Sequence, residues 1–218
     1  MAAVAPARPA PTPEGDGAAP DAALGAVPSA PSARAEGGPF LWTRERYDQA
    51  VNAGVFGPDD KIELIEGYLF PQMPQNTPHS VATTLTATTL RQAFGAGIYV
   101  QEEKPIALSD LSEPEPDVAV IRGGPRDFLD DHPGPKVIDL IVEVAESSVR
   151  RDRGLRARAY AEAGINDYWI VNLPERVVEV HREPAGGTYR TKTTLAEGDA
   201  ISPVARPDAS VASADLLP

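Results

Sequence analysis

The sequence contains no cysteine among its 218 residues. Disulfides and thiolate metal sites are therefore excluded, which fits the cytoplasmic location that we expect. No apolar stretch approaches the roughly 20 residues that cross a bilayer, so we expect no membrane partner. A basic segment followed by an unbroken apolar run is also missing, and a signal peptide is not expected.

Aromatic residues are absent from the first 38 residues, which contain thirteen Ala, seven Pro and five Gly. Such a segment cannot bury enough apolar surface to offset the entropy of ordering it. We therefore predict a disordered arm over residues 1–38. Residues 39–218 are long enough to form one domain with a sizeable core.

Basic residues are fewer than acidic ones, and the net charge is −12. This charge argues against a general nucleic-acid coat, because phosphate binding depends on Lys and Arg. The basic charge is nevertheless concentrated in one short run, Arg150, Arg151, Arg153, Arg156 and Arg158. A polyanion would bind at this local patch. The alternative is a solvated helix face on which Asp152 and Arg156 pair four residues apart.

The hydrophobic pattern predicts helices that alternate with strands. Helices are expected over residues 43–53, 79–94 and 147–163. Strands are expected over residues 98–108, 116–121, 137–144, 168–172, 177–182 and 188–194, with a hairpin over 61–70 that turns at Glu66-Gly67. The predicted class is α/β (α+β), a mixed sheet with at least two helices packed against it.

Two of the predicted strands carry a carboxylate beside a run of β-branched residues. These carboxylates belong to Asp117 and Glu143. A charge on a core strand costs several kcal/mol unless it is compensated. A shared divalent cation would compensate both charges, and Mg²⁺ prefers oxygen ligands and keeps waters available for chemistry.

Several motifs occur in a fixed order along the chain. They are Glu63-Leu64-Ile65-Glu66-Gly67, Pro116-Asp117-Val118-Ala119-Val120, Ile141-Val142-Glu143-Val144-Ala145-Glu146-Ser147-Ser148, Asp152-Arg153-Gly154, Tyr160-Ala161-Glu162-Ala163-Gly164-Ile165 and Asp167-Tyr168-Trp169-Ile170-Val171. Over about residues 40–183 the chain resembles a bacterial family known as putative restriction endonucleases, formerly a domain of unknown function. That family belongs to the PD-(D/E)XK nuclease superfamily. The resemblance implies a restriction-endonuclease-like mixed sheet flanked by helices.

The resemblance also implies a metal site. Asp117, Glu143 and the main-chain carbonyl of Val144 match its ligands, which would hold Mg²⁺ or Mn²⁺. The lysine of the motif migrates to the following helix in this family, and Arg156 stands at that position here. Arginine stays protonated and cannot act as a general base, although it can stabilise charge on a phosphate.

The activity that follows is metal-dependent hydrolysis of DNA phosphodiester bonds, with DNA as the partner. Arg156 would act on the transition state, while Arg150, Arg151, Arg153 and Arg158 would contact flanking phosphates. A symmetric homodimer would suit double-strand cleavage.

Two further residues have counterparts in the family. Glu63 would add a catalytic carboxylate, and the alternative is a hairpin carboxylate in solvent. His79 would contact nucleic acid, and the alternative is that it caps or anchors the start of its helix.

Two alternative functions are set by the same residues. A catalytically weakened nuclease-fold module that binds DNA or a protein partner is favoured by the arginine at position 156 and by the acidic charge. A glycosidase acid/base pair lacks an aromatic sugar platform. Tyr168 and Trp169 lie on an apolar strand and are expected in the core rather than as a base-stacking surface, and Asp139 is expected at the rim of the sheet.

Deleting residues 1–38 should leave the melting temperature nearly unchanged, because this arm offers no periodic apolar residues to the domain. Thermal unfolding of the full chain and of the truncated protein measures the difference. A fall of many degrees would show that the arm packs on the domain.

Overall fold

The structure is a computed structural model that describes residues 38–57 and 59–218. Apart from Gly38, the predicted arm lies outside the described residues. Within these two ranges, no helix has the length and apolar character that crossing a membrane requires.

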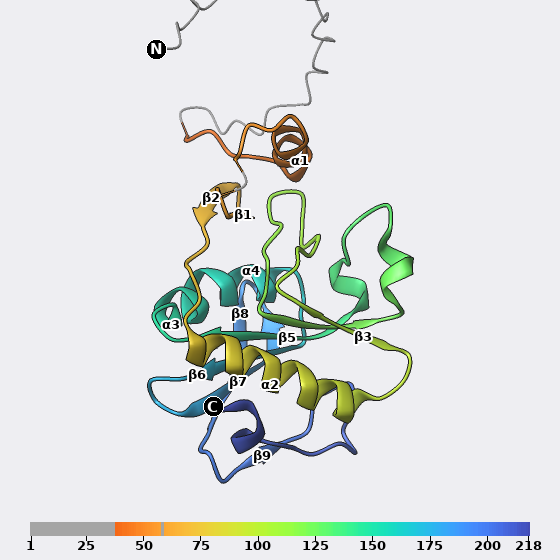
Figure 1. The fold of residues 1–218 in the computed structure, drawn as a ribbon, viewed down its shortest axis with the longest axis vertical. Coiled ribbons are helices and arrows are strands. Elements are labelled where there is room, and N and C mark those ends of the chain that lie inside the picture. Colours follow the sequence, from red (N-terminus) through yellow and green to blue (C-terminus); the bar gives the residue numbers. More distant parts are fainter. Residues whose placement is uncertain (1–37, 58) are drawn as a thin grey trace, which may run out of the picture. The chain divides into compact units, whose positions relative to one another are not determined.

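A six-stranded mixed sheet organises the fold, in the order β3-β4-β5-β6-β7-β8 (Figure 1). Its strands are β3(Ile98–Glu102), β4(Val118–Arg122), β5(Ile138–Ala145), β6(Asp167–Asn172), β7(Val177–Ala185) and β8(Thr188–Leu195). Strands β5 and β6 pair in parallel, and the other neighbours are antiparallel. The parallel pair requires a crossover, which the helical segment between these two strands provides.

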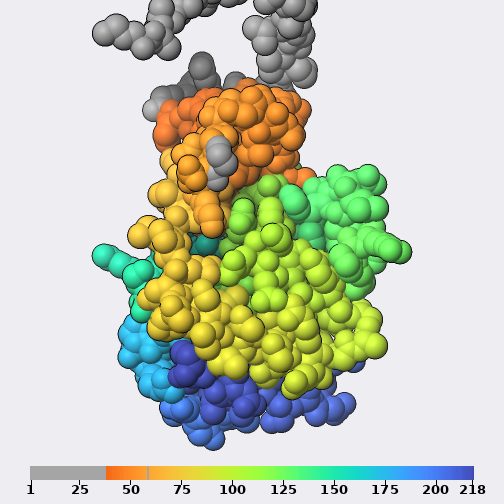
Figure 2. Space-filling view, viewed as in Figure 1, coloured from red at the N-terminus to blue at the C-terminus, as the bar shows by residue number. Residues whose placement is uncertain are grey.

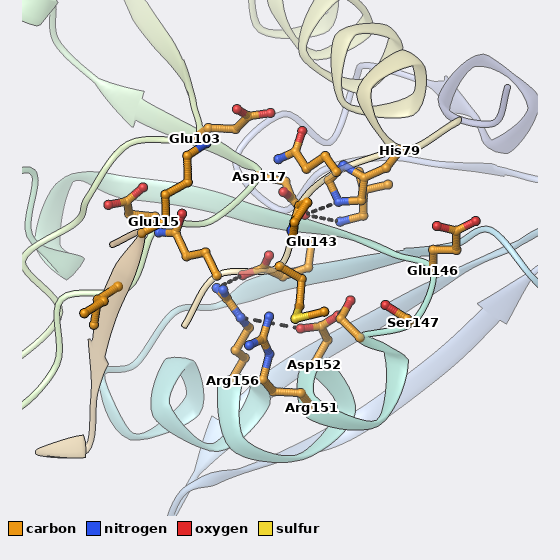
Figure 3. Close-up of a pocket in the computed structure, with 18 of the residues that line it drawn as sticks. His79, Glu103, Glu115, Asp117, Glu143, Glu146, Ser147, Arg151, Asp152 and Arg156 are labelled. Carbon is orange, nitrogen blue, oxygen red and sulfur yellow. Dashed lines mark hydrogen bonds and ion pairs between the residues drawn. The ribbon is translucent and has the colours of Figure 1, made fainter. Parts of the chain in front are cut away.

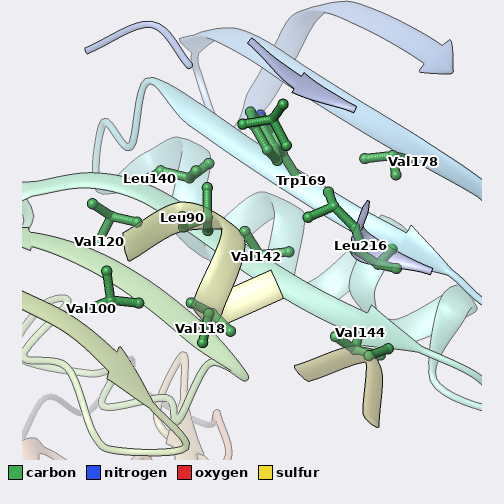
Figure 4. Close-up of a cluster of buried hydrophobic side chains, with 14 of the residues drawn as sticks. Leu90, Val100, Val118, Val120, Leu140, Val142, Val144, Trp169, Val178 and Leu216 are labelled. Atoms are coloured by element: carbon green, nitrogen blue, oxygen red, sulfur yellow. The ribbon is translucent and has the colours of Figure 1, made fainter. Parts of the chain in front are cut away.

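One face of the sheet packs against α2(Thr77–Phe94) and the C-terminal 3₁₀-helix η4(Ser213–Leu216). Alternate residues of β5 point to this face and join a buried cluster that includes Leu90, Val118, Leu140, Val142, Trp169 and Leu216 (Figure 4). Trp169 is fully buried, which confirms the prediction that it is a core residue.

The intervening residues of β5 point to the opposite face, which is covered by the helical segment between β5 and β6. This segment is α3(Val149–Arg151), the π-helix η3(Asp152–Arg156) and α4(Ala157–Glu162). Its cluster includes Ile141, Tyr160, Ile165, Tyr168 and Ile170. Tyr168 is fully buried, as predicted.

A separate two-stranded sheet lies N-terminal to α2 in the sequence. It pairs β1(Ile62–Ile65) with β2(Tyr68–Pro71), and the turn at Glu66-Gly67 is the predicted one. Both turn residues have positive φ, and a Cβ on Gly67 would lie 2.8 Å from Leu41 Cβ, so glycine is required there. Helix α1(Arg44–Asn52) falls within the predicted range 43–53 and is capped by the Thr43 side chain.

Several element boundaries differ from the prediction. Helix α2 begins at Thr77 because the Asn76 side chain accepts a hydrogen bond from the His79 N–H (3.1 Å) and caps the helix earlier. The strand predicted over 98–108 ends at Glu102, where the positive φ of Glu103 turns the chain. The helix predicted over 147–163 is interrupted by the π-helix.

Besides η4, four short elements were not predicted from the sequence. They are the 3₁₀-helices η1(Pro125–Phe128) and η2(Pro135–Val137) and the strands β9(Ala200–Ile201) and β10(Val211–Ala212). Two-residue strands carry no readable hydrophobic period, so their pairing depends on tertiary contacts.

Leu90→Ala should lower the free energy of unfolding by about 2–5 kcal/mol, because Leu90 is fully buried between α2 and the sheet. Val81→Ala on the same helix is the control: its side chain is exposed, and the expected change is below about 0.5 kcal/mol. Urea unfolding of both variants tests the packing of α2. Equal losses would contradict it.

Candidate active site

The structure brings Asp117 and Glu143 to one cleft. Val118 of β4 pairs with Val142 of β5 in antiparallel register, so Asp117 stands opposite Glu143 at the next position. Both side chains line a cleft of about 840 Å³ (Figure 3). In the space-filling view, the yellow surface before α2 adjoins the green surface after β3, and residues from both segments line this cleft (Figure 2).

Asp117 is held at the end of β4 by one of its two carboxylate oxygens. Oδ2 accepts a hydrogen bond from the Val144 N–H (2.7 Å) and lies 3.4 Å from His79 Nε2. Oδ1 has no hydrogen-bond partner within the described part of the chain. Burial alone would lower the pKa of His79, but the hydrogen bond to Asp117, the charge of Asp117 and a hydrogen bond to the Val144 backbone raise it above its ordinary value.

Glu143 is almost fully buried and is also held by one oxygen. Oε1 accepts hydrogen bonds from Tyr160 Oη (2.6 Å) and Arg156 Nη1 (2.6 Å). Among the residues described, none donates to Oε2. Burial raises the pKa of Glu143 well above its usual range, and the charges of Asp117 and Asp152 raise it further, although Arg156 and Tyr160 oppose the shift.

Arg156 lies at the base of the cleft and is only 5% exposed. Its Nη2 donates to both carboxylate oxygens of Glu63 (2.8 Å each), and its Nη1 contacts Tyr160 Oη (3.2 Å) as well as Glu143. The guanidinium therefore points toward Glu143. The predicted contact of Arg156 with a phosphate does not fit this geometry, because protein oxygens already engage all four of its Nη hydrogens.

Glu63 is fully buried on β1, so the alternative of a hairpin carboxylate in solvent is wrong. Its two oxygens bind Arg156, and Oε2 also accepts a long hydrogen bond from the Glu115 N–H (3.4 Å). The Arg156 guanidinium therefore links the Glu63 carboxylate to the Glu143 carboxylate, where the sequence predicted that Glu63 would join a metal site.

Asp152 belongs to the π-helix and completes the buried acidic group. Its Oδ1 lies 3.5 Å from Arg156 Nε, and its Oδ2 accepts a hydrogen bond from Ser148 Oγ (2.6 Å). Burial raises the pKa of Asp152 to about 6, against the opposing effects of Arg156 and Ser148. A π-helix places residues four apart almost in line, so Asp152 and Arg156 face the same side. The predicted pairing is confirmed, but the predicted solvated helix face is wrong, because both side chains are buried.

The arginine run is divided among different surroundings. Arg151 lines the cleft beside Arg156, and its Nη1 lies 3.8 Å from Glu63. Arg150 is exposed and has no carboxylate partner within residues 38–57 and 59–218.

The other two arginines of the run are paired outside the cleft. Arg153 Nε and Nη2 bind Glu179, at 2.6–3.1 Å. Arg158 Nε donates to Glu66 at 2.6 Å. The structure therefore does not gather the five arginines into one phosphate-binding patch, because carboxylates from other elements already pair with three of them, Arg153, Arg156 and Arg158.

Three features of the cleft were missed in the sequence. The helical spacing of Tyr160 is typical of a core residue. Its position four residues after Arg156, on the same helix face, is the only sequence signal that it contacts Arg156 and Glu143. Glu103 and Glu146 lie on the cleft at the ends of β3 and β5. Among the described lining residues, seven carboxylates face four Lys or Arg side chains, so the cleft carries net negative charge.

A divalent cation suits the donors that remain free. Within the described ranges, no three His, Cys, Asp or Glu side chains form a group that could hold a metal ion. The predicted site, however, needs two carboxylates and a carbonyl, and both Asp117 Oδ1 and Glu143 Oε2 are free of protein donors. Two carboxylate oxygens at an acidic cleft fit a hydrated Mg²⁺ or Mn²⁺.

Comparison with known proteins agrees with this geometry. Residues 44–214 match the profile of the Uma2 family, described as "Putative restriction endonuclease". The chain belongs to this family. Family membership supports a nuclease, a hydrolase that acts on nucleic acids.

The fold of this Uma2 protein also has a solved counterpart. The crystal structure of a putative nuclease belonging to DUF820 from Anabaena variabilis superposes with a TM-score of 0.60 at 17% identity, covering 80% of this chain and 97% of that one. At this identity the match shows the fold, and it confirms the predicted restriction-endonuclease-like class. No curated protein matches the sequence.

Asp152→Asn should change how stability depends on pH. The pKa of Asp152 is about 6 in the folded protein against an ordinary value of 3.8, so the folded state holds this proton more tightly than the unfolded state. The resulting stabilisation is fully present below pH 3.8 and is lost as the pH rises through about 6. The loss is on the order of 3 kcal/mol.

Asparagine has no such proton to lose. The free energy of unfolding of Asp152→Asn, relative to wild type, should therefore rise between about pH 4 and about pH 7, as urea titrations at both values would show. Parallel pH profiles for the two proteins would contradict the raised pKa.

Proposed function

We propose that this protein is a metal-dependent endonuclease that hydrolyses DNA phosphodiester bonds. The observation that supports this most directly is that Asp117 and Glu143, from adjacent strands, each leave one carboxylate oxygen free in the same cleft. Membership of the Uma2 family gives independent support for a nuclease.

Asp117, Glu143 and the Val144 carbonyl would hold the cation. When bound, Mg²⁺ lowers the pKa of a coordinated water and binds a phosphate oxygen. Tyr160 and Arg156 hold Glu143 Oε1 and leave Oε2 without a protein donor, so Oε2 would be the oxygen that binds the cation. The Val144 N–H likewise binds Asp117 Oδ2 and leaves Oδ1 without a protein donor.

DNA binding in this cleft depends on few cationic side chains. Arg151 is the residue of the arginine run that we assign to a phosphate, because it lines the cleft and its ion pair with Glu63 is long, at 3.8 Å, with Glu63 already bound to Arg156. Arg150 would contact the flanking backbone from outside the cleft. Since the cleft is acidic, we expect DNA to bind weakly without a divalent cation. A symmetric dimer would place two such sites on the two strands.

His79 would also contact the bound nucleic acid. Its Nε2 lies beside Asp117, and its first-turn position on α2 places it at the mouth of the cleft. Because Nε2 is directed at Asp117, a protonated His79 would donate to a phosphate oxygen from Nδ1, in place of its long contact with Thr83 Oγ1 (3.5 Å).

A second candidate is a nuclease-fold module that binds DNA or a protein without cutting. It is favoured by the position of Arg156, whose donors are engaged by carboxylates where the superfamily uses a lysine. The two candidates differ in whether metal binding is followed by strand cleavage.

Asp117→Asn and Glu143→Gln should each reduce Mg²⁺-dependent nicking of supercoiled plasmid by at least about a hundredfold, because each removes a charged ligand. Asp139→Asn is the matched control, since Asp139 lies at the other end of β5 beside Arg122 (3.2 Å). That variant should nick at the wild-type rate.

Unchanged nicking by Asp117→Asn would overturn the proposed site. A wild type that binds Mn²⁺ in calorimetry but cleaves neither DNA nor RNA would favour the binding module instead. Linear rather than nicked product at early times would support the dimer.

A further inference from the structure

Large apolar side chains line part of the acidic cleft. They belong to Val51 in the last turn of α1, Phe56 in the loop after that helix, and Met73 between β2 and α2. Val51 is 48% exposed and Met73 is 63% exposed, while Phe56 is half-buried. We call these three residues the apolar wall. Single exposed apolar residues are common on protein surfaces, but three in one cleft beside the candidate catalytic carboxylates are available to a ligand.

Aromatic packing holds the wall in place. The Phe56 ring lies 6.0 Å from the Tyr47 ring and 6.3 Å from the Trp42 ring, measured between centroids. Tyr47 is buried and also lines the cleft. Val51 follows Tyr47 by one helical turn and therefore lies on the same side of α1. Val51 and Phe56 are thus two parts of one surface.

The segment that carries Met73 is joined to this surface through the hairpin. Tyr47 Oη donates a hydrogen bond to the Ile62 carbonyl (2.6 Å) at the start of β1. One residue earlier, the Lys61 carbonyl accepts a hydrogen bond from the Gln72 N–H (2.8 Å), and Met73 follows directly. The wall is therefore formed before any ligand binds.

Charge makes this cleft a poor site for duplex DNA. Seven carboxylates and four Lys or Arg side chains line it among the described residues. A duplex carries about one negative charge per 1.7 Å of its axis, and a single strand carries about half that density. The repulsion between the cleft and its ligand is therefore smaller for one strand than for two.

The wall offers an interaction that does not depend on charge. Nucleobases have apolar faces that bind aromatic side chains, but in a duplex these faces are stacked on neighbouring base pairs and only the base edges are accessible. The cleft volume of about 840 Å³ lies within the range of roughly 300–1,000 Å³ that is typical of small-molecule sites. Such a volume suits about one or two nucleotides rather than a segment of duplex.

We propose that the apolar wall binds unpaired bases and that the cleft accepts single-stranded DNA in preference to duplex. In this arrangement the bases contact Phe56 and Met73, while the phosphates face Arg151. The inference rests on the proposed function for the choice of DNA as the ligand. It does not require the metal site.

The test compares the affinity of the full chain for a labelled single strand of about ten nucleotides and for a hairpin duplex of the same sequence. Fluorescence anisotropy in metal-free buffer at low salt measures both. The single strand should bind at least about tenfold more tightly, because only its bases can reach the wall. Equal affinities, tighter binding of the duplex, or no binding of either would overturn the proposal.

Phe56→Leu keeps an apolar side chain but removes the aromatic face. It should weaken single-strand binding by at least about fivefold and leave duplex binding unchanged. Phe40→Leu is the matched control, because the Phe40 ring lies 6.0 Å from the Trp42 ring but is not among the described residues that line the cleft. An equal loss in both variants would overturn the proposal by showing that the aromatic residues support only the fold.

Met73→Ala is the second variant, and it keeps the proposal testable if Phe56→Leu does not fold. Met73 is exposed, so its truncation should leave the fold intact and weaken single-strand binding by at least about threefold. Leu129→Ala is its control, since Leu129 is 82% exposed and lies outside the described lining of the cleft. Equal affinities of these two variants would count against the proposal. A concentration-dependent dimer that Met73→Ala abolishes would overturn it by assigning the wall to a second copy of the chain.

Intrinsic fluorescence reports on the wall directly, because the chain has two tryptophans. Trp169 is fully buried in the core, whereas Trp42 is half-buried beside Phe56. The single strand should quench the emission of wild type but not that of Trp42→Phe. Quenching that persists in Trp42→Phe would place the ligand elsewhere and overturn the proposal.

The two proposals fail separately. If the single strand binds through Phe56 but Mg²⁺ produces no cleavage, the nuclease activity is refuted and the role of the wall stands. If wild type cleaves single strand and duplex at equal rates, and Phe56→Leu and Phe40→Leu behave alike, only the role of the wall is refuted.

Discussion

The ion pairs between Arg156 and three buried carboxylates connect parts of the chain that are otherwise separate. Glu63 belongs to a two-stranded sheet that does not share hydrogen-bonded strands with the main sheet, and Glu143 belongs to the most apolar strand of that main sheet. Breaking a buried pair of this kind typically costs about 3–5 kcal/mol, because the remaining charge has no partner. The geometry of the candidate site and the attachment of the hairpin thus depend on the same guanidinium.

The sheet prepares this position by sorting side chains onto two faces. Along β5, Leu140, Val142 and Val144 pack under α2, whereas Ile141 and Glu143 face the helical segment that carries Arg156. The alternation of a strand therefore places one carboxylate among apolar neighbours, where Arg156 and Tyr160 of the covering helical segment reach it. Burial raises the free energy of the charged Glu143 carboxylate, and the two hydrogen bonds that offset this cost leave only Oε2 free.

Most of the architecture was readable from periodicity, because β5 to β8 have long apolar or alternating runs and the hairpin turn is signalled by Glu66-Gly67. Asp117 and Glu143 were predictable because a charge within such a run is anomalous. The partners of the arginines were not predictable, since Glu66, Glu175 and Glu179 are brought to them by tertiary packing from distant positions. The π-helix was missed for a similar reason: its sequence is compatible with an ordinary α-helix, and only the fit of Asp152 and Tyr168 favours the wider turn.

The π-helix has a consequence for how this segment tolerates insertion and deletion. Tyr168 Oη donates to the carbonyl of Asp152 (3.1 Å), which also accepts the wide-turn hydrogen bond from the Ala157 N–H. Such a turn accommodates one residue more than an α-helix would, and each residue of an α-helix corresponds to a rotation of about 100°. In a regular α-helix the loss of one residue would rotate everything after it, but here the loss of a single residue such as Gly154 can convert the π-turn to an α-helical turn. We therefore expect α4 to keep its orientation relative to α3, and Tyr160 to keep its contact with Glu143.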